Sequence, residues 1–406
     1  MAALVDSTPL MCDFLDSFDY EKPLSLYIHV PFCDSKCSYC AFFSVSGYHD
    51  DVKAGYVSRL LSELEEVVDR MDGHAFETAY IGGGNPGCLD VRSLYEIAGL
   101  VCRNGRPKEF TVEMNPDSLS PEMDVLFDDL FTRLSLGIQS LEKRALEFLG
   151  RNATLEQTYQ GLELSQNIGA KTGCELSYDL ITCLGSWHDP LKDVQALCSG
   201  FPSNHLSVYA LTLEEGTPLF KRHPSLPDDD MQARILESVW SALEERDFEH
   251  YEVSNFAKNG RRGLHNCRYW GYRPYVGLGP GAASTAFKEG LVRRFDSKKS
   301  VYDYIGGPRF SGVSCETLTR EESLEEFVLM GLRYKGGLDL GRLENEFGCR
   351  VTPSLFDNLD GYFVEDGRLV PTNDGLLIAD YAALEILNRL SSTDCSNSLD
   401  SANRCM

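Results

Sequence analysis

Basic residues are scarce in this sequence compared with acidic ones. The 406 residues include 38 Lys and Arg against 62 Asp and Glu, so the formal net charge is −24 at pH 7. A surface this acidic repels the phosphates of nucleic acids and the headgroups of anionic membranes. We therefore expect no nucleic-acid partner and no electrostatic attraction to such a membrane.

Long apolar runs are missing as well. No stretch approaches the roughly 18 consecutive apolar residues that span a bilayer, so no stable membrane insertion is expected. The first twenty residues are acidic and lack the basic start and apolar run of a secretory signal peptide. These absences predict a soluble, cytoplasmic protein.

Cysteine is plentiful, but its spacing does not fit a disulfide framework. The 14 cysteines are irregularly placed in a long chain, whereas disulfide scaffolds are short and secreted. Most of these thiols are expected to be small buried hydrophobic side chains. Only Cys33, Cys37 and Cys40 have the spacing of metal ligands.

Short apolar runs alternate with amphipathic helical patterns in the first half of the chain, without internal repeats. The strand candidates are residues 25–30, 78–82, 110–115, 133–139, 175–181 and 205–212. The helical patterns between them include residues 54–70, 91–103, 141–149 and 155–168. Six β-then-α units predict an α/β fold with a parallel sheet, curled into a full or partial barrel. In such folds the chemistry lies at the carboxyl ends of the strands.

Three cysteines in C-x3-C-x2-C spacing follow the first strand candidate. Three thiolates hold three irons of a cubane 4Fe–4S cluster and leave the fourth iron without a protein ligand. The amino and carboxylate groups of S-adenosylmethionine are suited to chelate that iron, while the protein supplies position and electrostatics. Two alternatives stay open here: unrelated cysteines in a loop, and a zinc site, which needs a fourth ligand.

Polar or unusual residues also end the later strand candidates. The glycines at positions 82–84 remove every Cβ and let the backbone approach a ligand. Polar side chains follow at or near the ends of later strands, at Glu113, Gln139 and Asp179, and Arg151 begins a helix twelve residues after Gln139. A polar residue in such a place either meets a ligand or needs an internal partner. Each alone fits both roles equally well, but their recurrence on successive units favours a shared site.

The cysteine spacing, with Tyr39 between two of the cysteines, resembles the signature of the radical-SAM superfamily. The resemblance extends to coproporphyrinogen dehydrogenase, HemN, and its relative HemW, and runs from Leu24 to Leu390. It rests on Tyr-Ile-His-Val-Pro-Phe-Cys, Gly-Gly-Gly-x-Pro, Glu-x-Asn-Pro, Leu-Gly-Ile-Gln-Ser, Leu-Gly-Arg and Tyr-Ala-Leu-Thr-x-Glu-x-Gly-Thr. It implies a partial (β/α)6 radical-SAM barrel with a cluster on the three cysteines.

The resemblance also implies residues at or near S-adenosylmethionine. They are Tyr27, Tyr39, Gly83, Gly84, Asn85, Glu113, Gln139, Arg151, Asp179, Ala210 and Ala283. The chain departs from the family around this set. Asn85 and Gly87 replace two threonines, Cys183 and Trp187 stand in a segment that normally carries Gly, Pro and Gln, and Ala283 replaces a frequent His. S-adenosylmethionine binding with altered or slow cleavage is consistent with these changes.

Two features distinguish the branches of the family. The oxidase resembles C-x3-C-x2-C-x-C, whereas this chain has Phe42 in the last position, as HemW-type proteins do. The stretches Tyr-Glu-Val-Ser-Asn-Phe-Ala from Tyr251 and His-Asn-Cys-Arg-Tyr-Trp from His265 resemble HemW elements, the second associated with heme binding. Histidine ligates heme iron, and Tyr269 and Trp270 offer flat faces to a porphyrin. A packed loop with a structural His265 remains an equally good interpretation.

Three functions follow. The favoured one is a HemW-like heme chaperone that binds cluster, S-adenosylmethionine and heme or porphyrin, receives electrons from a reductant protein and delivers heme to heme-accepting proteins. The second is an oxygen-independent coproporphyrinogen III oxidase in porphyrin biosynthesis. The third is a degenerate member that keeps the fold and cluster as a binding protein.

The same resemblance divides the chain into five parts. Residues 1–22 form an N-terminal extension, 23–250 the core barrel, 251–315 a connecting region, 316–390 a small helical, winged-helix-like C-terminal domain, and 391–406 a disordered tail. Helical patterns cover residues 231–245, 324–334, 340–347 and 375–390, and residues 367–370 fit one arm of a hairpin.

Overall fold

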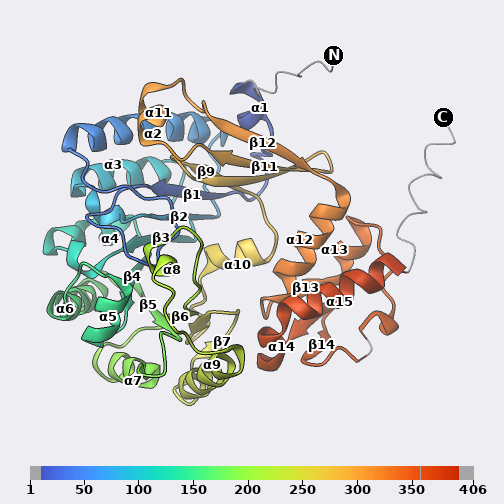
Figure 1. Cartoon of the computed structure of the whole chain (residues 1–406). Helices are drawn as coiled ribbons and strands as arrows, with labels where there is room; N and C mark the ends of the chain where they lie inside the picture. The colour runs from blue at the N-terminus through green and yellow to red at the C-terminus, as the bar shows by residue number, and fades with distance from the viewer. Residues whose placement is uncertain (1–10, 357, 393–406) are drawn as a thin grey trace.

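The computed structural model describes residues 11–356 and 358–392, so most of the predicted tail and the first half of the predicted extension lie outside the described residues. Within this part of the chain, one twelve-stranded sheet forms the body and a three-stranded sheet lies near the C-terminus (Figure 1). The chain is therefore a mixed α/β protein.

Six parallel strands form the centre of the large sheet and neighbour one another in chain order. They are β1 (Ser25–Val30), β2 (Thr78–Gly83), β3 (Glu109–Met114), β4 (Arg133–Gln139), β5 (Glu175–Thr182) and β6 (His205–Ala210). Each lies where the apolar runs predict a strand, and the ends differ by at most two residues. The parallel arrangement follows because a helix separates successive strands.

Helices cover the outer face of this sheet (Figure 1). They are α2 (Asp50–Arg70), α3 (Val91–Val101), α4 (Val125–Asp129), α5 (Lys143–Leu149), α6 (Leu155–Thr172), α7 (Pro190–Gly200) and α9 (Asp229–Glu244). Their starts follow from local sequence, because side chains such as Asp90 and Thr154 accept the free N–H groups of the first turn. The start of α6 is a complete capping box with Gln157.

The two faces of the sheet differ in chemistry. Alternate residues such as Leu26, Ile28 and Val30 are buried in the main hydrophobic core. The residues between them face the concave side, which carries polar groups such as Glu113 and Asp179. The sheet order starts at β12 and ends at β7, so the barrel is open rather than closed. A polar concave face in an open barrel is suited to a ligand rather than to a packed core.

Further strands extend both edges. On one side are β9 (Tyr275–Leu278), parallel to β1, and the antiparallel β10 (Ala283–Lys288), β11 (Leu291–Ser297) and β12 (Val313–Leu318). On the other are β8 (Asn255–Ala257) and β7 (Glu249–His250). The stretch 251–315, expected to connect two domains through strand-like or glycine-rich segments at 251–257 and 276–284, adds several strands to the sheet. Charged residues within β11 obscure its strand pattern in the sequence.

A short helix, α10 (Leu264–Trp270), closes the amino-terminal end of the barrel. The Glu109 carboxylate at the start of β3 accepts the backbone N–H groups of Leu264 and His265, both at 3.0 Å. Arg133 at the start of β4 donates to the same carboxylate at 3.1 Å. A buried carboxylate at a helix start satisfies N–H groups that the helix leaves unpaired. This network fixes α10 beneath the strands.

The C-terminal unit is helical, but it also contains a sheet of order β13-β15-β14. Its elements are α12 (Arg320–Leu332), β13 (Leu338–Asp339), α13 (Leu340–Asn345), β14 (Tyr362–Glu365), β15 (Arg368–Pro371), α14 (Asn373–Leu377) and α15 (Ala379–Ser392). The predicted helix over 375–390 is divided at Ile378 into α14 and α15. Residues of this unit, together with Tyr272, form a hydrophobic cluster of their own.

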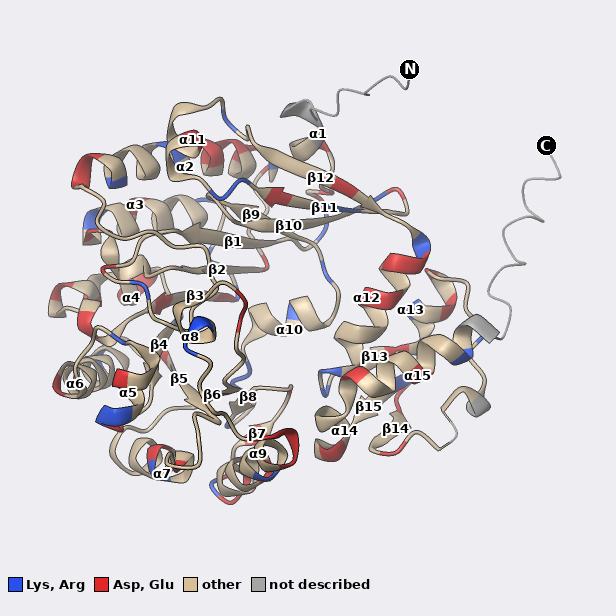
Figure 2. Ribbon diagram, in the orientation of Figure 1, with Lys and Arg blue, Asp and Glu red and all other residues tan. Residues whose placement is uncertain are grey.

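Shorter elements connect these layers. They are α1 (Met11–Asp16), α8 (Pro218–Lys221), α11 (Val301–Gly306) and the 3-10 turns Pro86–Cys88, Pro116–Ser118, Pro121–Asp124 and Pro353–Phe356. Acidic residues lie on the outer helices, including the start of α12, in agreement with the net charge (Figure 2). None of the described helices combines the length and apolarity that a bilayer crossing requires.

Candidate functional site

The three predicted cluster cysteines lie on one loop that follows β1. Cys33, Cys37 and Cys40 are half-buried thiols. The loop is closed by two backbone hydrogen bonds, from the Cys33 N–H to the Val45 carbonyl at 3.0 Å and from the Val45 N–H to the Pro31 carbonyl at 2.8 Å. The cysteines are therefore held at the carboxyl end of the first strand.

Neighbouring elements fix the middle of this loop. The Ser38 N–H donates to the Leu149 carbonyl at 2.9 Å, and the Leu219 N–H donates to the Ser38 carbonyl at 2.8 Å. Gly150 ends α5 with φ +66°, and a Cβ there would lie 3.0 Å from Ser38. Glycine is favoured at this position by both the backbone conformation and the close approach of the loop. The loop conformation is thus set by contacts on several sides.

The thiols influence one another and also meet a cation. Burial raises the pKa of Cys33 to about 11, and the nearby Cys40 and Cys37 add to the rise. Arg151 donates from Nη1 to Cys37 Sγ at 3.6 Å and to Asn115 Oδ1 at 3.1 Å, and from Nη2 to the Gly137 carbonyl at 2.6 Å. Arg151 thus holds a positive charge beside one of the three sulfurs.

These residues fit an iron–sulfur cluster. The donor set is three thiols from one rigid loop, with a fixed cation at one of them. No group of three or more His, Cys, Asp or Glu side chains in residues 11–356 and 358–392 is arranged as a site for a single metal ion. Cys33, Cys37 and Cys40 would hold the cluster, which supplies electron transfer when bound.

The glycine run after β2 packs directly against this loop. Gly84 donates its N–H to the Val30 carbonyl at 2.8 Å, and a Cβ on it would lie 2.5 Å from the Phe32 carbonyl oxygen. A Cβ on Gly83 would lie 2.6 Å from the His29 ring. Gly83 has φ +108°, a conformation that other residues rarely adopt. Strand packing therefore requires these glycines, whether or not a ligand lies beside them.

Asn85 closes the glycine run. It is 1% exposed, and its Oδ1 accepts from the N–H groups of Gly87 and Asn115 and from the Ser118 hydroxyl, each at 3.2 Å. The side chain thereby joins the loops after β2 and β3. Its Nδ2 is buried without a partner. A Cβ on Gly87 would clash with Ser118, which explains why this chain has no threonine there.

Two carboxyl groups lie inside the barrel. Glu113 accepts from the Tyr80 hydroxyl and from the Gly83 N–H at 3.4 Å, and Asp179 accepts from the Ser135 hydroxyl at 3.1 Å. Burial raises the pKa of Glu113 to about 7, and the charge of Asp179 adds to this rise. Burial likewise raises the pKa of Asp179 to about 6. Near neutral pH, both groups are within reach of taking up a proton.

Two strand ends carry unusual backbone. Gln139 has φ +67° beside a register shift in β4, and Cys183 has φ +63° directly after β5. Positive φ in a residue other than glycine is uncommon and often occurs at functional sites. Cys183 therefore adopts a glycine-like conformation at the position where the family has glycine. Trp187 packs against Gly185, and the Arg144 guanidinium lies 4.3 Å from its ring centroid.

The other residues expected near S-adenosylmethionine are spread around the same end of the barrel. The Tyr27 hydroxyl bonds to His29 Nδ1 at 2.9 Å, and the opposite ring nitrogen bonds to the Phe43 carbonyl of the cysteine loop at 2.8 Å. Tyr39 is half-buried and packs against the hydrophobic cluster that contains Leu149 and Ile181. Ala210 ends β6, and Ala283 begins β10. Both are half-buried.

His265, in contrast, lies at the opposite end of the barrel from the cysteines. It is 1% exposed in α10, with Nδ1 2.9 Å from the Thr78 hydroxyl and Nε2 2.8 Å from the Tyr269 hydroxyl. Burial lowers its pKa to about 3. Both ring nitrogens are therefore engaged within the protein. In this arrangement His265 positions Tyr269, and iron ligation would require one of these bonds to open.

A pocket of about 510 Å³ lies beside α10; we call it the lateral pocket. It is bounded by Tyr209 from β6, the 252–255 segment, the end of α10, Tyr275 of β9 and one face of α12. Trp270 and Tyr269 line it, whereas His265 does not. The volume is in the range of small-molecule sites. The lateral pocket thus places both predicted porphyrin-facing rings on one wall.

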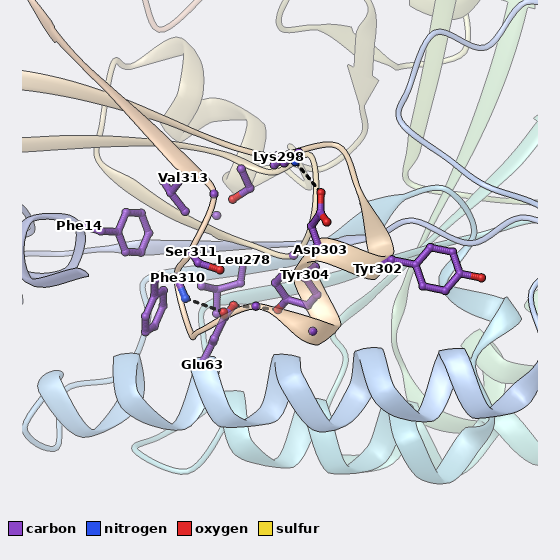
Figure 3. A pocket seen from close by; sticks show the side chains of 16 residues that line it. Phe14, Glu63, Leu278, Lys298, Tyr302, Asp303, Tyr304, Phe310, Ser311 and Val313 are labelled. Atoms are coloured by element: carbon purple, nitrogen blue, oxygen red, sulfur yellow. Dashed lines mark hydrogen bonds and ion pairs between the residues drawn. The ribbon is translucent and has the colours of Figure 1, made fainter. Parts of the chain in front are cut away.

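A second hollow, of about 430 Å³, lies across the molecule beside α2 (Figure 3). Glu63 of α2, Tyr304 and Phe310 line it. The Glu63 carboxylate accepts from the Phe310 N–H and from the Tyr304 hydroxyl, both at 2.8 Å, as the dashed lines of Figure 3 indicate. Because this carboxylate is fully partnered, the hollow carries no sign of a ligand.

Sequence reasoning missed several residues of the concave face. Tyr80 and Ser135 bond directly to Glu113 and Asp179, and Glu252 lies buried in the lateral pocket. Tyr80 and Ser135 stand an even number of residues from polar groups of their own strands, so strict alternation was the signal that could have revealed them. Glu252 lies outside regular strands, and its only signal was its place in the stretch from Tyr251 that resembles a HemW element.

Comparisons with known proteins agree with this architecture. A family model described as the Radical SAM superfamily matches residues 27–190. Heme chaperone HemW of Lactococcus lactis is 32% identical over 81% of this chain and 86% of its own, and the HemW of Escherichia coli is 34% identical over 70% and 76%. The structure entitled coproporphyrinogen III oxidase (HemN) from Escherichia coli superposes with a TM-score of 0.75 at 20% identity, covering 93% of both chains.

The structural match shows a shared fold, and the sequence matches cover most of the chain. Radical SAM proteins carry a 4Fe–4S cluster and S-adenosylmethionine, which agrees with the cysteine loop and the polar concave face described above. This chain belongs to the radical SAM superfamily and, within it, to the HemN/HemW family.

Proposed function

We propose that this protein is a heme chaperone that binds a 4Fe–4S cluster, S-adenosylmethionine and heme, and delivers heme to acceptor proteins. The observation that carries the proposal is the run of relatives named heme chaperone HemW, which are 30–34% identical over most of the chain. Phe42 supports it, since it occupies the position of the fourth cysteine in the oxidase pattern. Phe42 is 69% exposed on the cysteine loop.

In this proposal Cys33, Cys37 and Cys40 hold the cluster. The residues that bind or flank S-adenosylmethionine are Tyr27, Tyr39, Gly83, Gly84, Asn85, Glu113, Gln139, Arg151, Asp179, Ala210 and Ala283. Arg151 fixes one cluster sulfur, and the carboxyls of Glu113 and Asp179 hold or release a proton near neutral pH. Cluster and S-adenosylmethionine together supply reductive cleavage of a sulfonium bond when bound.

The proposal also assigns parts of the chain. Residues 23–250 form the core that carries the cluster, residues 251–315 carry the heme-associated element, and residues 316–390 form the winged-helix-like C-terminal domain. The separate hydrophobic cluster of the last part supports this division. A reductant protein and a heme-accepting protein are the expected partners.

Anaerobic reconstitution followed by spectroscopy tests the proposal. We expect about four irons per chain, a cluster spectrum that changes when S-adenosylmethionine is added, and loss of both in Cys33→Ala. Titration with hemin should give a stable complex at micromolar protein, weakened by His265→Ala. Bound zinc in place of iron would contradict the proposed cluster, and a cluster spectrum that S-adenosylmethionine does not change would contradict the proposed S-adenosylmethionine site. The absence of a hemin complex would contradict the heme-chaperone proposal.

Coproporphyrinogen III oxidase activity is the second candidate. Membership of the HemN/HemW family supports it, and so do the three arginines that line the lateral pocket, because the substrate carries several carboxylates. Phe42 opposes it. An anaerobic assay with a reductant and S-adenosylmethionine decides: robust formation of protoporphyrinogen would replace the chaperone proposal, and its absence in cluster-loaded protein would remove the oxidase.

A further inference from the structure

The lateral pocket contains buried acceptor atoms that the cluster site does not use. Glu252 is 1% exposed, and neither of its carboxylate oxygens has a hydrogen-bond partner. Asn255 is 3% exposed, and its Oδ1 also lacks a partner. Both residues line the pocket. A buried acceptor without a donor is costly, so this arrangement favours a ligand that supplies a donor or a Lewis acid.

The backbone around Glu252 is fixed. The Val253 N–H donates to the Arg333 carbonyl at 3.2 Å, and the Lys335 N–H donates to the Tyr251 carbonyl at 2.9 Å. Glu252 itself forms an antiparallel bridge with Tyr334. This pairing ties the barrel to the C-terminal unit. The backbone of Glu252 is therefore held between the barrel and the C-terminal unit, with the side chain buried at the pocket.

Aromatic side chains form the walls of the pocket. Tyr209, Tyr269, Trp270 and Tyr275 all line it, and the rings of Tyr269 and Tyr275 meet edge to face at 4.6 Å. Flat rings of this kind bind planar apolar ligands, because they offer a large contact area with little loss of conformational freedom. A planar, conjugated ring system is the complementary shape.

Arginines supply the positive charge at the pocket. Arg294 is paired with Glu326 at 2.5 Å and Arg333 with Asp380 at 2.6 Å, whereas Arg273 makes no ion pair within the described residues. Burial and the charge of Arg342 lower the pKa of Arg273, against the charges of Glu346 and Asp339. Without an ion pair of its own, Arg273 is available to pair with a carboxylate on the ligand.

The pocket adjoins the polar interior of the barrel. Tyr209 and Asn266 line the lateral pocket and also a small cavity of about 30 Å³ that contains Glu113 and Asp179. A ligand in the lateral pocket would therefore be separated from the barrel carboxyls by a wall one side chain thick. Its inner edge faces the polar interior rather than bulk water.

We infer, resting on the proposed function, that the lateral pocket binds the tetrapyrrole, with Glu252 as its anchor on the inner wall and Arg273 as the partner of a ring carboxylate. The Glu252 oxygens either ligate the iron of heme or accept the pyrrole N–H groups of a metal-free ring. His265 acts through the Tyr269 hydroxyl, which it positions from beneath. It is a positioning residue and not an iron ligand.

Titrations of the cluster-loaded full chain with hemin and with metal-free protoporphyrin test this inference. Hemin binding is read from the Soret difference spectrum and protoporphyrin binding from its fluorescence. Glu252→Gln should raise the Kd about tenfold for at least one of the two ligands, and Arg273→Gln about threefold for both. Arg92→Gln, a charge-matched change on the exposed face of α3, should leave both Kd values unchanged.

The two ligands separate the two roles of Glu252. An effect on hemin alone identifies iron ligation, and an effect on protoporphyrin alone identifies N–H acceptance; either supports the inference. Met330→Trp is a second test, because it fills the pocket from α12 and leaves Glu252 intact. It should abolish binding of both ligands while the cluster spectrum stays unchanged.

The outcome that overturns the inference is distinct from failure of the proposed function. If the unaltered chain binds hemin, and Glu252→Gln, Arg273→Gln and Met330→Trp bind both ligands with unchanged Kd, the tetrapyrrole binds elsewhere. A Soret band altered only by His265→Ala would then indicate His265 as the ligand. If the unaltered chain binds neither ring, the proposed function fails with it.

Discussion

A buried glutamate lines each of the two hollows that flank the barrel, and the two side chains differ in their partners. Glu63, 3% exposed, accepts hydrogen bonds from Phe310 and Tyr304 and lies 3.4 Å from Arg59 Nε. Glu252, 1% exposed, has backbone N–H groups and the Trp270 indole nearby, but no partner with hydrogen-bond geometry. The cavities themselves are similar, at about 430 and 510 Å³.

The difference separates a structural group from a candidate binding group. Burial raises the pKa of both carboxyls, and for Glu252 the value is about 7. Donors around Glu63 compensate the cost of burial and join α2 to the segment after α11. The Asn255 side chain, the N–H groups of Ser254 and Asn255 and the Trp270 indole lie near Glu252 and partly offset its burial, but none has hydrogen-bond geometry with the carboxylate. Cavity size and burial are therefore weaker signs of function than an unsatisfied polar group.

The largest expected difference is in stability. Glu63→Ala should lower the free energy of unfolding by about 4 kcal/mol, because it leaves two buried donors unpaired and removes the counter-charge of Arg59, which keeps its bonds to backbone carbonyls. Glu252→Ala, which removes a buried charge and no hydrogen bond of good geometry, should not lower it at pH 7.5. Urea titrations at pH 7.5 measure both. Equal losses of stability in the two variants would contradict the distinction between Glu63 as a structural group and Glu252 as a candidate binding group.

The next largest expected effect is the contribution of Glu252 to the pH dependence of stability. The pKa of Glu252 is raised to about 7 in the folded protein, so between about pH 4.5 and 7 the folded state holds a proton that the unfolded state has lost. Stability therefore falls as the pH rises through this range, by up to about 3 kcal/mol from this group.

Glu252→Gln removes that contribution. The variant should match the unaltered chain near pH 4 and exceed it in stability near pH 8, as measured by urea midpoints across the range. Glu113 and Asp179 keep their own contributions in both proteins, so the difference isolates one group. Parallel curves for the two proteins would show that Glu252 is ionised and solvated.

A smaller effect is expected beneath the lateral pocket. His265→Ala should lower the free energy of unfolding by about 2 kcal/mol, because the Thr78 and Tyr269 hydroxyls lose their partner and the Tyr80 ring loses a neighbour at 5.1 Å. Thermal melts of the cluster-loaded protein measure the loss, and Thr78→Val is the matched control for one of the two bonds. An unchanged melting temperature would mean that His265 is free for a ligand.

The smallest effects on stability are expected for residues at the rims of the two hollows. Tyr302 is 66% exposed beside the Glu63 hollow, and Arg273 lies at the edge of the lateral pocket. Tyr302→Ala and Arg273→Ala should each change the stability by less than about 0.5 kcal/mol, as exposed substitutions usually do. Only Arg273→Ala should also weaken hemin binding. If Tyr302→Ala also weakened hemin binding, the hollow beside Glu63 would become the candidate heme site.

Much of the fold could be predicted from local patterns. The strands from Ser25 and Arg133 begin and end where the apolar runs do, and the helix from Leu155 begins at its capping box. The antiparallel strands of residues 283–318 could not be predicted in the same way. Their charged residues hide the alternation, and their place in the sheet depends on pairing with β9, next to β1.

The candidate site shows the same division. The spacing of Cys33, Cys37 and Cys40 already indicated a cluster loop, since three ligands lie within eight residues of one another. From the sequence alone, His265 could be either a heme ligand or a structural residue. Its two hydrogen-bond partners could not be predicted, because they depend on the position of α10 under the strands. Arg151 was expected near S-adenosylmethionine, but its bond to Cys37 Sγ was not foreseen.

The sequence by itself determined the properties that neighbouring residues control: the alternation of strands and helices, the helix caps and the thiol spacing. Only the tertiary structure decided which buried polar groups find partners. Thr78 reaches His265 across 187 positions and Tyr304 reaches Glu63 across 241, whereas neither carboxylate oxygen of Glu252 has a partner with hydrogen-bond geometry. The physical reason is that hydrogen bonds act over a few ångströms in space, and the fold alone sets which distant residues come that close.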